Sequence, residues 1–417
     1  MKILVCLHDY LPNHPGGSEV HAHQSARELL RRGHEVTALY TERDLSAEEG
    51  SLRHGELDGV KTIECVHQRE YADVRQSFEQ STFLAAFEEA LAEVQPDVVH
   101  FHHLALWGSG VLPAAKRSGA RVLITLHDYF LLCDVSTLMT PESELCQEGL
   151  RGECTSCLRR HPLRPELWPK EQRELPLDEL WKLAARARFD QHRADLQAAD
   201  LVISPSRFLA DRFGEAGFFD SEAVEILRAG YPGSAHAPKQ RDMSQPLHVG
   251  YVGGVYPSKG LHVLVKAMAH LKDAPLQLDL HGHLDWFPDY VETLRADAKG
   301  TRTAFHGPYP PAEVDRILGE FDVLVVPSIW YENMPITIQE AFRNGLPVVT
   351  TDLGGMSEAV THNVDGLTFP RGDDRALAEC LRSLATDAEL YNRLASGRSV
   401  PPTLEEIVDR LEQLYRS

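Results

Sequence analysis

The sequence has little basic charge and no long apolar run. Its 42 lysines and arginines are outnumbered by 62 aspartates and glutamates, which gives a formal net charge of −20 at pH 7. This balance argues against a nucleic-acid-binding protein, which would carry a basic surface, and against a strong attraction to anionic lipid. No apolar run approaches the ~18–20 residues of a membrane-spanning helix. We therefore expect no nucleic-acid partner and at most peripheral contact with a membrane.

The first residues do not have the pattern expected of an export signal. Only five apolar residues lie between Lys2 and His8, which is too few for the core of a signal peptide. We therefore expect a cytoplasmic protein, at most peripheral at the inner face of the membrane.

Residues 159–193 depart from the acidic trend, with nine lysines and arginines against six aspartates and glutamates. We interpret this stretch as a solvated helical hairpin, with local contact to a membrane surface as the alternative.

Cysteine is scarce, yet four of the seven cysteines lie between positions 133 and 157. These four are Cys133, Cys146, Cys154 and Cys157, whereas Cys6, Cys65 and Cys380 lie in apolar patterns typical of small core residues. In a cytoplasmic chain, such a cluster points to metal or redox chemistry before structural disulfides. The Cys-Thr-Ser-Cys end has the spacing of a metal knuckle, and residues 131–158 contain few apolar side chains around which to fold. A structural zinc ion is the leading interpretation; an iron–sulfur cluster, redox disulfides and unliganded thiols are the alternatives.

Both halves of the chain alternate short apolar strands with helical stretches. At ~150 residues per domain, 417 residues correspond to two or three domains. The predicted strands are residues 3–7, 35–40, 97–100, 122–126 and 200–203, then 247–252, 277–281, 304–305, 323–326 and 348–350. Such strands, separated by helices, are typical of parallel sheets covered on both faces. We therefore predict two doubly wound, Rossmann-like α/β domains that face each other across a ligand-binding cleft.

Composition also marks the expected domain boundaries. Residues 231–246 are rich in proline, glycine and serine and show no periodicity, which indicates a linker. We predict an N-terminal domain over residues 1–230, with a cysteine-rich insertion at 131–158, and a C-terminal domain over residues 247–395. A helix is expected within the remaining residues 396–417.

The most informative segment covers residues 327–342. A strand ends near its start, a loop follows, and Pro335 is placed to open a helix. The free backbone amides of Ile336 and Thr337 would then form an anion site at the positive end of the helix dipole. The sequence therefore predicts a phosphate-binding position at the start of this helix.

Two glutamates flank the predicted anion site, because Glu332 precedes the helix and Glu340 lies one turn inside it. Carboxylates on both sides suit a ligand with hydroxyls on both sides of its phosphates, as in a nucleotide sugar. The Glu-x7-Glu spacing resembles the signature of glycosyltransferase family 4, whose members are retaining enzymes of the GT-B fold. The resemblance covers nearly the whole chain through an ordered set of motifs: Gly16-Gly17-Ser-Glu, Asp97-Val-Val-His100-Phe-His102, Thr125-Leu-His127-Asp128, residues 253–260, His306-Gly307, Gly345-Leu-Pro347, Asp352-Leu-Gly354-Gly355 and Asp365-Gly366.

The resemblance implies a role for each matching residue. Glu340 corresponds to the glutamate that holds the nucleotide ribose, and Glu332 to the one that meets the donor sugar's hydroxyls. Lys259 corresponds to the lysine paired with the diphosphate, where a cation stabilises the departing nucleoside diphosphate. A positive charge at the start of a helix is unfavourable, because that end of the helix dipole is itself positive. We therefore interpret Lys259 as a residue that binds an anionic ligand, with an ordinary surface lysine as the alternative. His127 is expected beside the sugar as a positioning group, with a histidine of no chemical role as the alternative.

The same resemblance implies the rest of the site and its ligands. Further donor-binding residues are Gly16, Gly17, Gly253, Met334, Pro335, Ile336 and Thr337. Tight turns are the alternative role of the first two glycines. No catalytic metal is expected, because Lys259 and the helix amides would take its place. The implied partners are a UDP- or GDP-linked sugar and a hydroxyl acceptor on a glycan, a lipid-linked precursor or a small molecule. The helix within residues 396–417 is expected to pack back on the N-terminal domain.

Two departures from the family pattern open alternatives. The family's arginine after the glycine at 253 is replaced by Gly254, so that either Arg228 or another basic residue compensates or the donor binds more weakly. Asn333 and Met334 replace the usual small residues after the first glutamate and change the wall near the sugar. A nucleotide-binding scaffold without catalysis is therefore the first alternative. A phosphorylase or epimerase on the same fold and a metal- or redox-sensing protein are the others.

Overall fold

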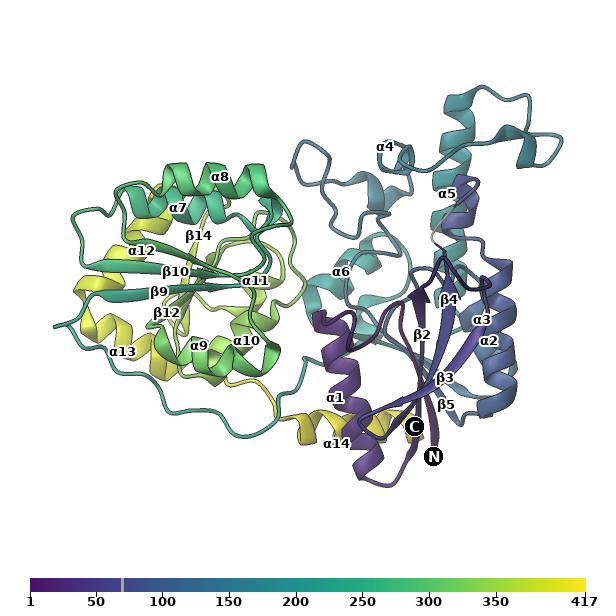
Figure 1. Cartoon of the computed structure of the whole chain (residues 1–417), viewed down its shortest axis with the longest axis horizontal. Helices are drawn as coiled ribbons and strands as arrows, with labels where there is room; N and C mark the ends of the chain where they lie inside the picture. Colours follow the sequence, from purple (N-terminus) through teal and green to yellow (C-terminus); the bar gives the residue numbers. More distant parts are fainter. Residues whose placement is uncertain (69–70) are drawn as a thin grey trace. The chain divides into compact units, whose positions relative to one another are not determined.

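The computed structural model describes residues 1–68 and 71–417, which form two compact units (Figure 1). The first unit contains Met1–Gly230 together with Leu404–Ser417, and the second contains Tyr231–Thr403. The chain therefore leaves the first unit after Gly230 and returns to it at Leu404, so that the C-terminal segment belongs to the N-terminal unit.

An eight-stranded sheet forms the centre of the first unit. Its strands are β1 (Lys2–Cys6), β2 (Glu35–Arg43), β3 (Leu52–Leu57), β4 (Val60–His67), β5 (Val98–Phe101), β6 (Arg121–Thr125), β7 (Leu201–Ser204) and β8 (Glu225–Ile226). Their order is β3-β4-β2-β1-β5-β6-β7-β8. β1 pairs in parallel with β2 on one side and β5 on the other. The strand order reverses there, so functional loops are expected after the carboxyl ends of β1 and β5.

The edge hairpin β3–β4 corrects the expectation of an all-parallel sheet. The two strands pair antiparallel and are joined by Asp58 and Gly59, whose φ angles are +50° and +84°. Asp-Gly is the residue pair that favours a two-residue hairpin turn with two left-handed positions. Neither strand was predicted: the side chains of β3 are mostly exposed and give no apolar run, and the apolar residues of β4 are interrupted by Lys61, Thr62 and Glu64.

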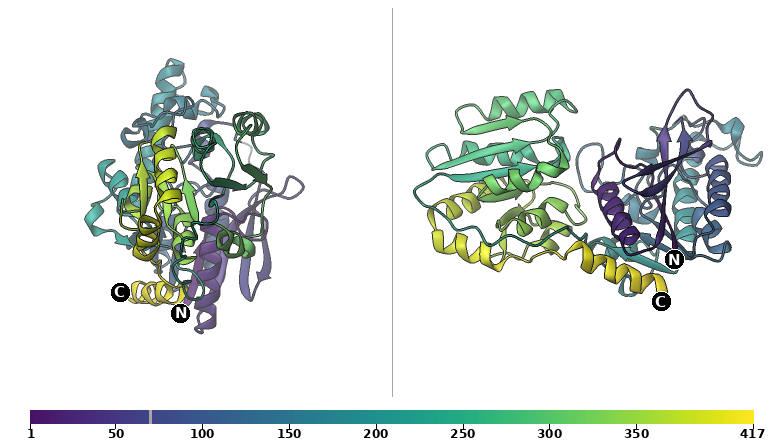
Figure 2. Two further views of the ribbon diagram at one scale, coloured as in Figure 1. Left: turned by 90° about the vertical axis from the view of Figure 1, so that its left-hand side faces the viewer. Right: turned by 60° about the horizontal axis from the view of Figure 1, so that its bottom comes forward.

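Helices cover both faces of the first sheet. They are α1 (Gly17–Arg31), α2 (Ser81–Val94), α3 (Val111–Arg117), α4 (Thr155–Leu158), α5 (Leu177–Leu196), α6 (Arg207–Glu215) and α14 (Leu404–Arg416), with short 3-10 helices at Val74–Ser77, Glu148–Arg151, Pro165–Leu167 and Ser221–Ala223. α1 and α14 lie on one face of the sheet, and α2 and α3 lie on the other (Figure 1). Two further views show the two ends of the chain side by side within this unit (Figure 2).

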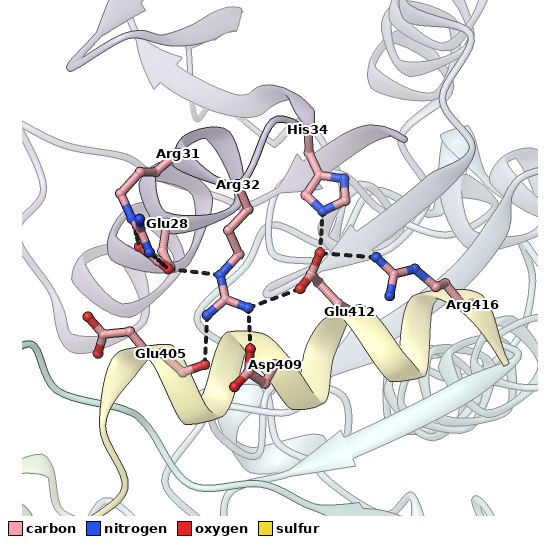
Figure 3. Close-up of polar contacts among 8 residues, drawn as sticks. All are labelled: Glu28, Arg31, Arg32, His34, Glu405, Asp409, Glu412 and Arg416. Atoms are coloured by element: carbon pink, nitrogen blue, oxygen red, sulfur yellow. Dashed lines mark hydrogen bonds and ion pairs between the residues drawn. The ribbon is translucent and has the colours of Figure 1, made fainter.

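The C-terminal helix α14 is fixed to the end of α1 by charged groups (Figure 3). Arg32 pairs with Asp409 and, at 2.9 Å, with Glu412, while its Nε donates to Glu28 at 2.8 Å. His34 Nε2 lies 2.6 Å from Glu412 Oε1. Leucine and isoleucine side chains of α14 are buried in the same core as β1 and α1. Apolar packing and ion pairs therefore both hold this helix on the first unit.

Residues 159–193 do not form the expected helical hairpin. α5 is one long helix, and the stretch before it is irregular apart from one 3-10 turn. Prolines at positions 162, 165, 169 and 176 are the physical reason, because each removes an amide donor and blocks a preceding helix. Several charges of this stretch are paired locally, as in Arg159–Asp178 and Arg186–Asp190, both at 2.7 Å.

A six-stranded sheet forms the centre of the second unit. Its strands are β9 (Leu247–Val252), β10 (Leu276–His281), β11 (Thr303–His306), β12 (Val323–Val326), β13 (Val348–Thr351) and β14 (Gly366–Phe369), in the order β11-β10-β9-β12-β13-β14. Its helices are α7 (Leu261–Ala269), α8 (Pro288–Asp297), α9 (Val314–Glu320), α10 (Ile336–Arg343), α11 (Gly355–Ala359), α12 (Asp374–Thr386) and α13 (Ala388–Gly397), with 3-10 helices at Pro257–Lys259 and Pro311–Glu313. α7, α8 and α12 cover one face, and α9 and α10 cover the other (Figure 1). The strand order reverses between β9 and β12, which pair in parallel.

The segment expected as a linker, residues 231–246, lies within the second unit. Its backbone donates hydrogen bonds to the end of α10, from His236 to the Arg343 carbonyl at 2.8 Å and from Lys239 to the Gly345 carbonyl at 3.0 Å. The last carbonyls of a helix lack intrahelical partners, so an extended segment beside them satisfies both groups. Its composition showed that the segment is irregular, but not that it is bonded to a neighbouring helix.

Candidate active site

Two loops of the second unit meet where the strand order reverses. One follows β9 and contains Gly253 and Lys259; the other follows β12 and leads through Glu332 into α10. The loops approach very closely at Gly260, where φ is +70° and an added Cβ would lie 2.0 Å from the carbonyl oxygen of Pro327. Any side chain at position 260 would therefore push the two loops apart.

Glu332 is the centre of a hydrogen-bond network between these loops. Its Oε1 accepts from Lys259 Nζ at 2.7 Å, from Ser328 Oγ at 2.6 Å and from Trp330 Nε1 at 2.8 Å. The Glu332 side chain is 8% exposed. Burial disfavours the charged form of Lys259, but the nearby Glu332 outweighs it and raises the pKa of the ammonium group. The sequence predicted both charged residues here but not their direct ion pair, and it gave no hint of the roles of Ser328 and Trp330.

The helix α10 begins just beyond this network. Pro335 is its N-cap, so the helix starts one residue later than a first-turn proline would place it. Met334 and Pro335 are buried, and Ile336 and Thr337 are partly exposed. The amides of the first two helical residues have no intrahelical acceptor and lie at the positive end of the helix dipole. This end of α10 can therefore bind an anion.

Glu340 lies one turn inside α10 and has a strongly perturbed carboxyl group. Burial, reinforced by the negative charge of Asp315, raises the pKa of Glu340 to about 7, although Arg343 opposes the shift. Arg343 is bonded to Asp315, with Nη1 2.9 Å from both carboxylate oxygens. The raised pKa identifies Glu340 as a candidate functional residue, because structural surface carboxylates seldom have such values.

The structure explains the glycine at 254. A Cβ at Gly254 would lie 2.3 Å from Cε1 of Tyr256, so an arginine would require this ring to move. Arg228, one candidate to replace that arginine, belongs to the first unit. Within the second unit, Arg371 lies beside the β12 loop and donates from Nε to the carbonyl of Ile329 at 2.7 Å. Arg371 has no motif signal in the sequence and was not predicted.

The first unit places several histidines after adjacent strands. His127 follows β6, and its Nε2 lies 3.0 Å from Nδ1 of His102, which follows β5. Burial, followed by charge repulsion from His21 and His103, lowers the pKa of His127 to about 3. The imidazole is therefore neutral at physiological pH. A neutral imidazole bonded to a second one can donate or accept a hydrogen bond without adding charge.

Further polar groups of the first unit were not predicted as site residues. His103 Nε2 lies 3.1 Å from Asp128 Oδ2. Glu19 is buried in the first turn of α1, 3.7 Å from His8 Nδ1, and its Oε2 would be 2.2 Å from a Cβ at Gly16. Gly16 is the N-cap of α1, and Gly17 is its first residue. A buried glutamate packed against Gly16 explains why this position has no side chain.

The seven cysteines are all free thiols. Cys133, Cys146 and Cys154 are buried and Cys157 is partly exposed. No three histidine, cysteine, aspartate or glutamate side chains among residues 1–68 and 71–417 are already arranged to hold a metal ion. Cys6 and Cys65 are buried as expected for core residues, whereas Cys380 is only partly buried.

Comparison with known proteins identifies the family. The pattern of "Glycosyltransferase Family 4" matches residues 15–231, just over half of the chain, and that of "Glycosyl transferases group 1" matches residues 246–387. The chain belongs to glycosyltransferase family 4. Together the two matches cover the loops of both units that contain the candidate site residues.

Curated relatives match part of this family 4 chain. The amylovoran biosynthesis glycosyltransferase AmsK of Erwinia amylovora is 31% identical over 211 residues, which are 46% of this chain and 52% of the relative. A D-inositol 3-phosphate glycosyltransferase of Corynebacterium urealyticum is 31% identical over 205 residues, which are 45% of this chain and 48% of the relative. The chain thus spans about half the length of these relatives.

Solved structures share the fold over the whole length. Anabaena HepE, solved with UDP and glucose, has a TM-score of 0.64 at 18% identity and covers 100% of this chain and 99% of its own. Sucrose-phosphate synthase from Thermosynechococcus elongatus has a TM-score of 0.67 at 20% identity and covers 99% of this chain and 98% of its own. The family 4 chain therefore has the GT-B fold, as its motifs predicted. In the part of the chain that the structure describes, no helix is both long and apolar enough to cross a membrane.

Proposed function

We propose that this family 4 protein is a retaining glycosyltransferase that uses a nucleotide-sugar donor. The observation that carries the proposal is the contact between Lys259 and Glu332 directly before the N-terminus of α10. A cation and the helix amides provide positive potential for a diphosphate, and a buried carboxylate beside them can bind sugar hydroxyls. Glu340, one turn further, provides a second carboxyl group for the ribose.

In the proposed reaction, the bond between the sugar's anomeric carbon and the β-phosphate oxygen breaks. A bond from the acceptor oxygen to the anomeric carbon forms on the same face of the sugar. The acceptor hydroxyl loses its proton to the departing phosphate oxygen, so no protein base is required. Lys259 and the α10 amides stabilise the negative charge that develops on the leaving diphosphate. His127, neutral at physiological pH, orients a sugar hydroxyl through a hydrogen bond.

The two units supply different parts of the reaction in this proposal. The second unit binds the donor through Lys259, Glu332 and Glu340, while the first unit binds the acceptor near His127. UDP is the first nucleotide to test, because the fold relative HepE was solved with UDP and with UDP-glucose; GDP is the second. The proposed acceptor is a hydroxyl group of a glycan or of a lipid-linked precursor, and no catalytic metal takes part.

The decisive experiment compares Glu332→Gln with the wild type in a donor-turnover assay and in a nucleotide-binding assay. The amide keeps the shape of the side chain but removes the charge that binds Lys259. We expect turnover to fall by about 10²- to 10³-fold, the range for loss of one electrostatic contact in an active site. Nucleotide affinity should change by less than about tenfold, because the ribose and phosphate contacts remain.

Glu320→Gln is the matched control, because Glu320 is an exposed glutamate of the same unit that pairs with Arg316 within α9. Its turnover should equal that of the wild type. Full turnover by Glu332→Gln would contradict the assignment of this residue to the sugar. Nucleotide binding without turnover of any UDP- or GDP-sugar by the wild type would instead favour a non-catalytic nucleotide-binding protein.

A further inference from the structure

The four clustered cysteines come from separate turns of one irregular segment. Cys133 follows a turn closed by its own amide on the Tyr129 carbonyl, at 2.7 Å. Cys146 lies beside an isolated bridge between Met139 and Leu145. Cys154 and Cys157 belong to the single turn of α4, the first as its N-cap. The proposed transfer reaction has no use for any of these residues.

The four thiol groups lie close enough to interact electrostatically, although they are separated in the sequence. Cys154 and Cys157 each interact with Cys133 and Cys146, and burial places three of the four inside the unit. Gly149 lies beside this region: a Cβ there would be in ordinary contact with Cys154 Sγ at 3.6 Å but only 2.8 Å from the Leu138 side chain. The fold therefore gathers the four sulfurs in one region without joining them by disulfides.

The backbone of the segment is strained and has little regular structure to support it. Ser136, Leu138 and Ser143 adopt left-handed φ angles of +60°, +49° and +67°. Each such residue costs about 1–3 kcal/mol when the surroundings enforce it. Residues 131–158 contain one 3-10 turn, one helical turn and one isolated bridge. Contrary to the expectation from the sequence, several apolar side chains of the segment are buried, among them Leu132, Leu138 and Leu158. Packing therefore holds part of the segment, and a bound ion would further stabilise the strained turns.

A buried cation lies beside the cluster. Arg188 of α5 has a side chain that is 4% exposed, and it interacts with Cys133, Cys154 and Asp134. Its Nη2 donates to the carbonyl of Phe130, whereas its Nε has no hydrogen-bond partner among the described residues. A buried guanidinium is stable only next to negative charge. Asp134 supplies part of this negative charge, with its Oδ1 3.7 Å from Arg188 Nε, and four thiolates around a divalent ion would add a net charge of about −2.

We propose that Cys133, Cys146, Cys154 and Cys157 bind one structural zinc ion. Four thiolates in a tetrahedron form a closed structural site, which leaves no position for substrate. Binding releases the four thiol protons to solvent, and the metal supplies the stabilisation that the strained turns lack. The side chains must turn toward a common centre, because none of the described groups is already arranged around an ion. The proposal does not depend on the transferase function.

The test measures the metal content of the full chain, purified under reducing conditions from cells supplied with both zinc and iron. We expect about one zinc per chain and no visible absorbance. Cys157→Ser and Cys154→Ser should each lose most of the zinc, and an organomercurial reagent should release it from the wild type. Cys380→Ser is the matched control, because Cys380 is a partly buried thiol in α12 of the second unit; it should keep the metal.

Three results would overturn the proposal. One is wild-type protein without metal, and another is iron with sulfide and visible absorbance. The third is zinc that survives in Cys157→Ser. Should Cys154→Ser not fold, Cys157→Ser still decides the question, because Cys157 is partly exposed and its loss removes little packing. Intense sulfur-to-metal absorption upon Co²⁺ addition to metal-depleted protein gives a second readout that does not rely on expression conditions.

Discussion

At the scale of single residues, Glu340 is the group whose chemistry the structure defines most sharply. Glu340 lies within α10, and the pKa of its carboxyl group is raised to about 7 by burial and by the nearby negative charge of Asp315. Ribose hydroxyls donate hydrogen bonds, and they bind an ionised carboxylate more strongly than a protonated one. Nucleotide binding should therefore draw Glu340 toward its ionised form and lower its pKa.

This argument predicts that nucleotide affinity rises with pH. In the free protein, Glu340 is mostly protonated at pH 6 and mostly ionised at pH 8, so UDP should bind about tenfold more tightly at pH 8. Calorimetric titration of wild type and Glu340→Gln over this range provides the check. The phosphate groups of UDP titrate equally in both experiments, so the difference between the two proteins isolates Glu340. Parallel pH profiles would show that Glu340 does not contact the ribose.

The sequence indicated candidate site residues but not their contacts with other side chains. Glu332, Glu340, Lys259 and His127 stand out as candidates because their spacing follows motifs on loops or helix starts after strands, and their roles stay predictions. The pairing of His127 with His102 could not, because it depends on the register of β5 and β6, which places the two following loops side by side. Contacts of this kind join residues 25 positions apart and leave no periodic signal.

At the scale of secondary-structure elements, most of the buried strands were predicted, but the mostly buried β4 and β14 were missed together with the exposed β3. β9 and β12 coincide with their predicted ranges, because β12 is a continuous apolar run and β9 is mostly apolar, interrupted only by His248 and Gly250. β3 escaped prediction because its side chains face solvent, although the Asp-Gly turn after it was visible in the sequence. The apolar pattern of α14 predicted the helix, but only its ion pairs with the end of α1 show how charge contributes to holding it on the first unit.

The contacts of α14 predict a pH-dependent stabilisation. The hydrogen bond to His34 and the contacts with Arg32 lower the pKa of Glu412. A lowered carboxyl pKa stabilises the folded state above the unfolded value of about 4.3, and this stabilisation is lost as pH falls through the folded pKa. Glu412→Gln should therefore reduce stability by about 1 kcal/mol at pH 7, with a smaller difference at pH 3.5.

Thermal midpoints of the full chain at the two pH values measure this effect. Glu405→Gln is the control, because Glu405 lies on the same helix and only its backbone carbonyl bonds to Arg32. It should melt within a degree of the wild type at both pH values. An equal loss of stability for Glu412→Gln at pH 7 and at pH 3.5 would assign the effect to packing instead of charge.

At the scale of the whole molecule, both units carry their candidate residues on loops at or near the point where the strand order of the sheet reverses. Each sheet reverses its strand order once near the middle, beside β1 in the first unit and beside β9 in the second. The loops that follow β1, β5, β9 and β12 contain the glycine-rich turns, His102 and the charged residues, whereas His127 follows β6, the strand next to β5. The net charge of −20 repels a nucleoside diphosphate at long range. In the proposed function, nucleotide binding therefore depends on local groups, the Lys259 ammonium and the first amides of α10.

This dependence on local groups predicts where a nucleotide protects the chain. In hydrogen exchange of the full protein, UDP should slow exchange most strongly at residues 253–260 and 332–340, the loops after β9 and β12. Inorganic phosphate at the same concentration is the control; without a ribose for Glu340, it should protect these segments much less. Protection confined to the first unit would contradict the assignment of the donor to the second. Equal protection by phosphate would show that α10 binds anions without recognising a nucleotide.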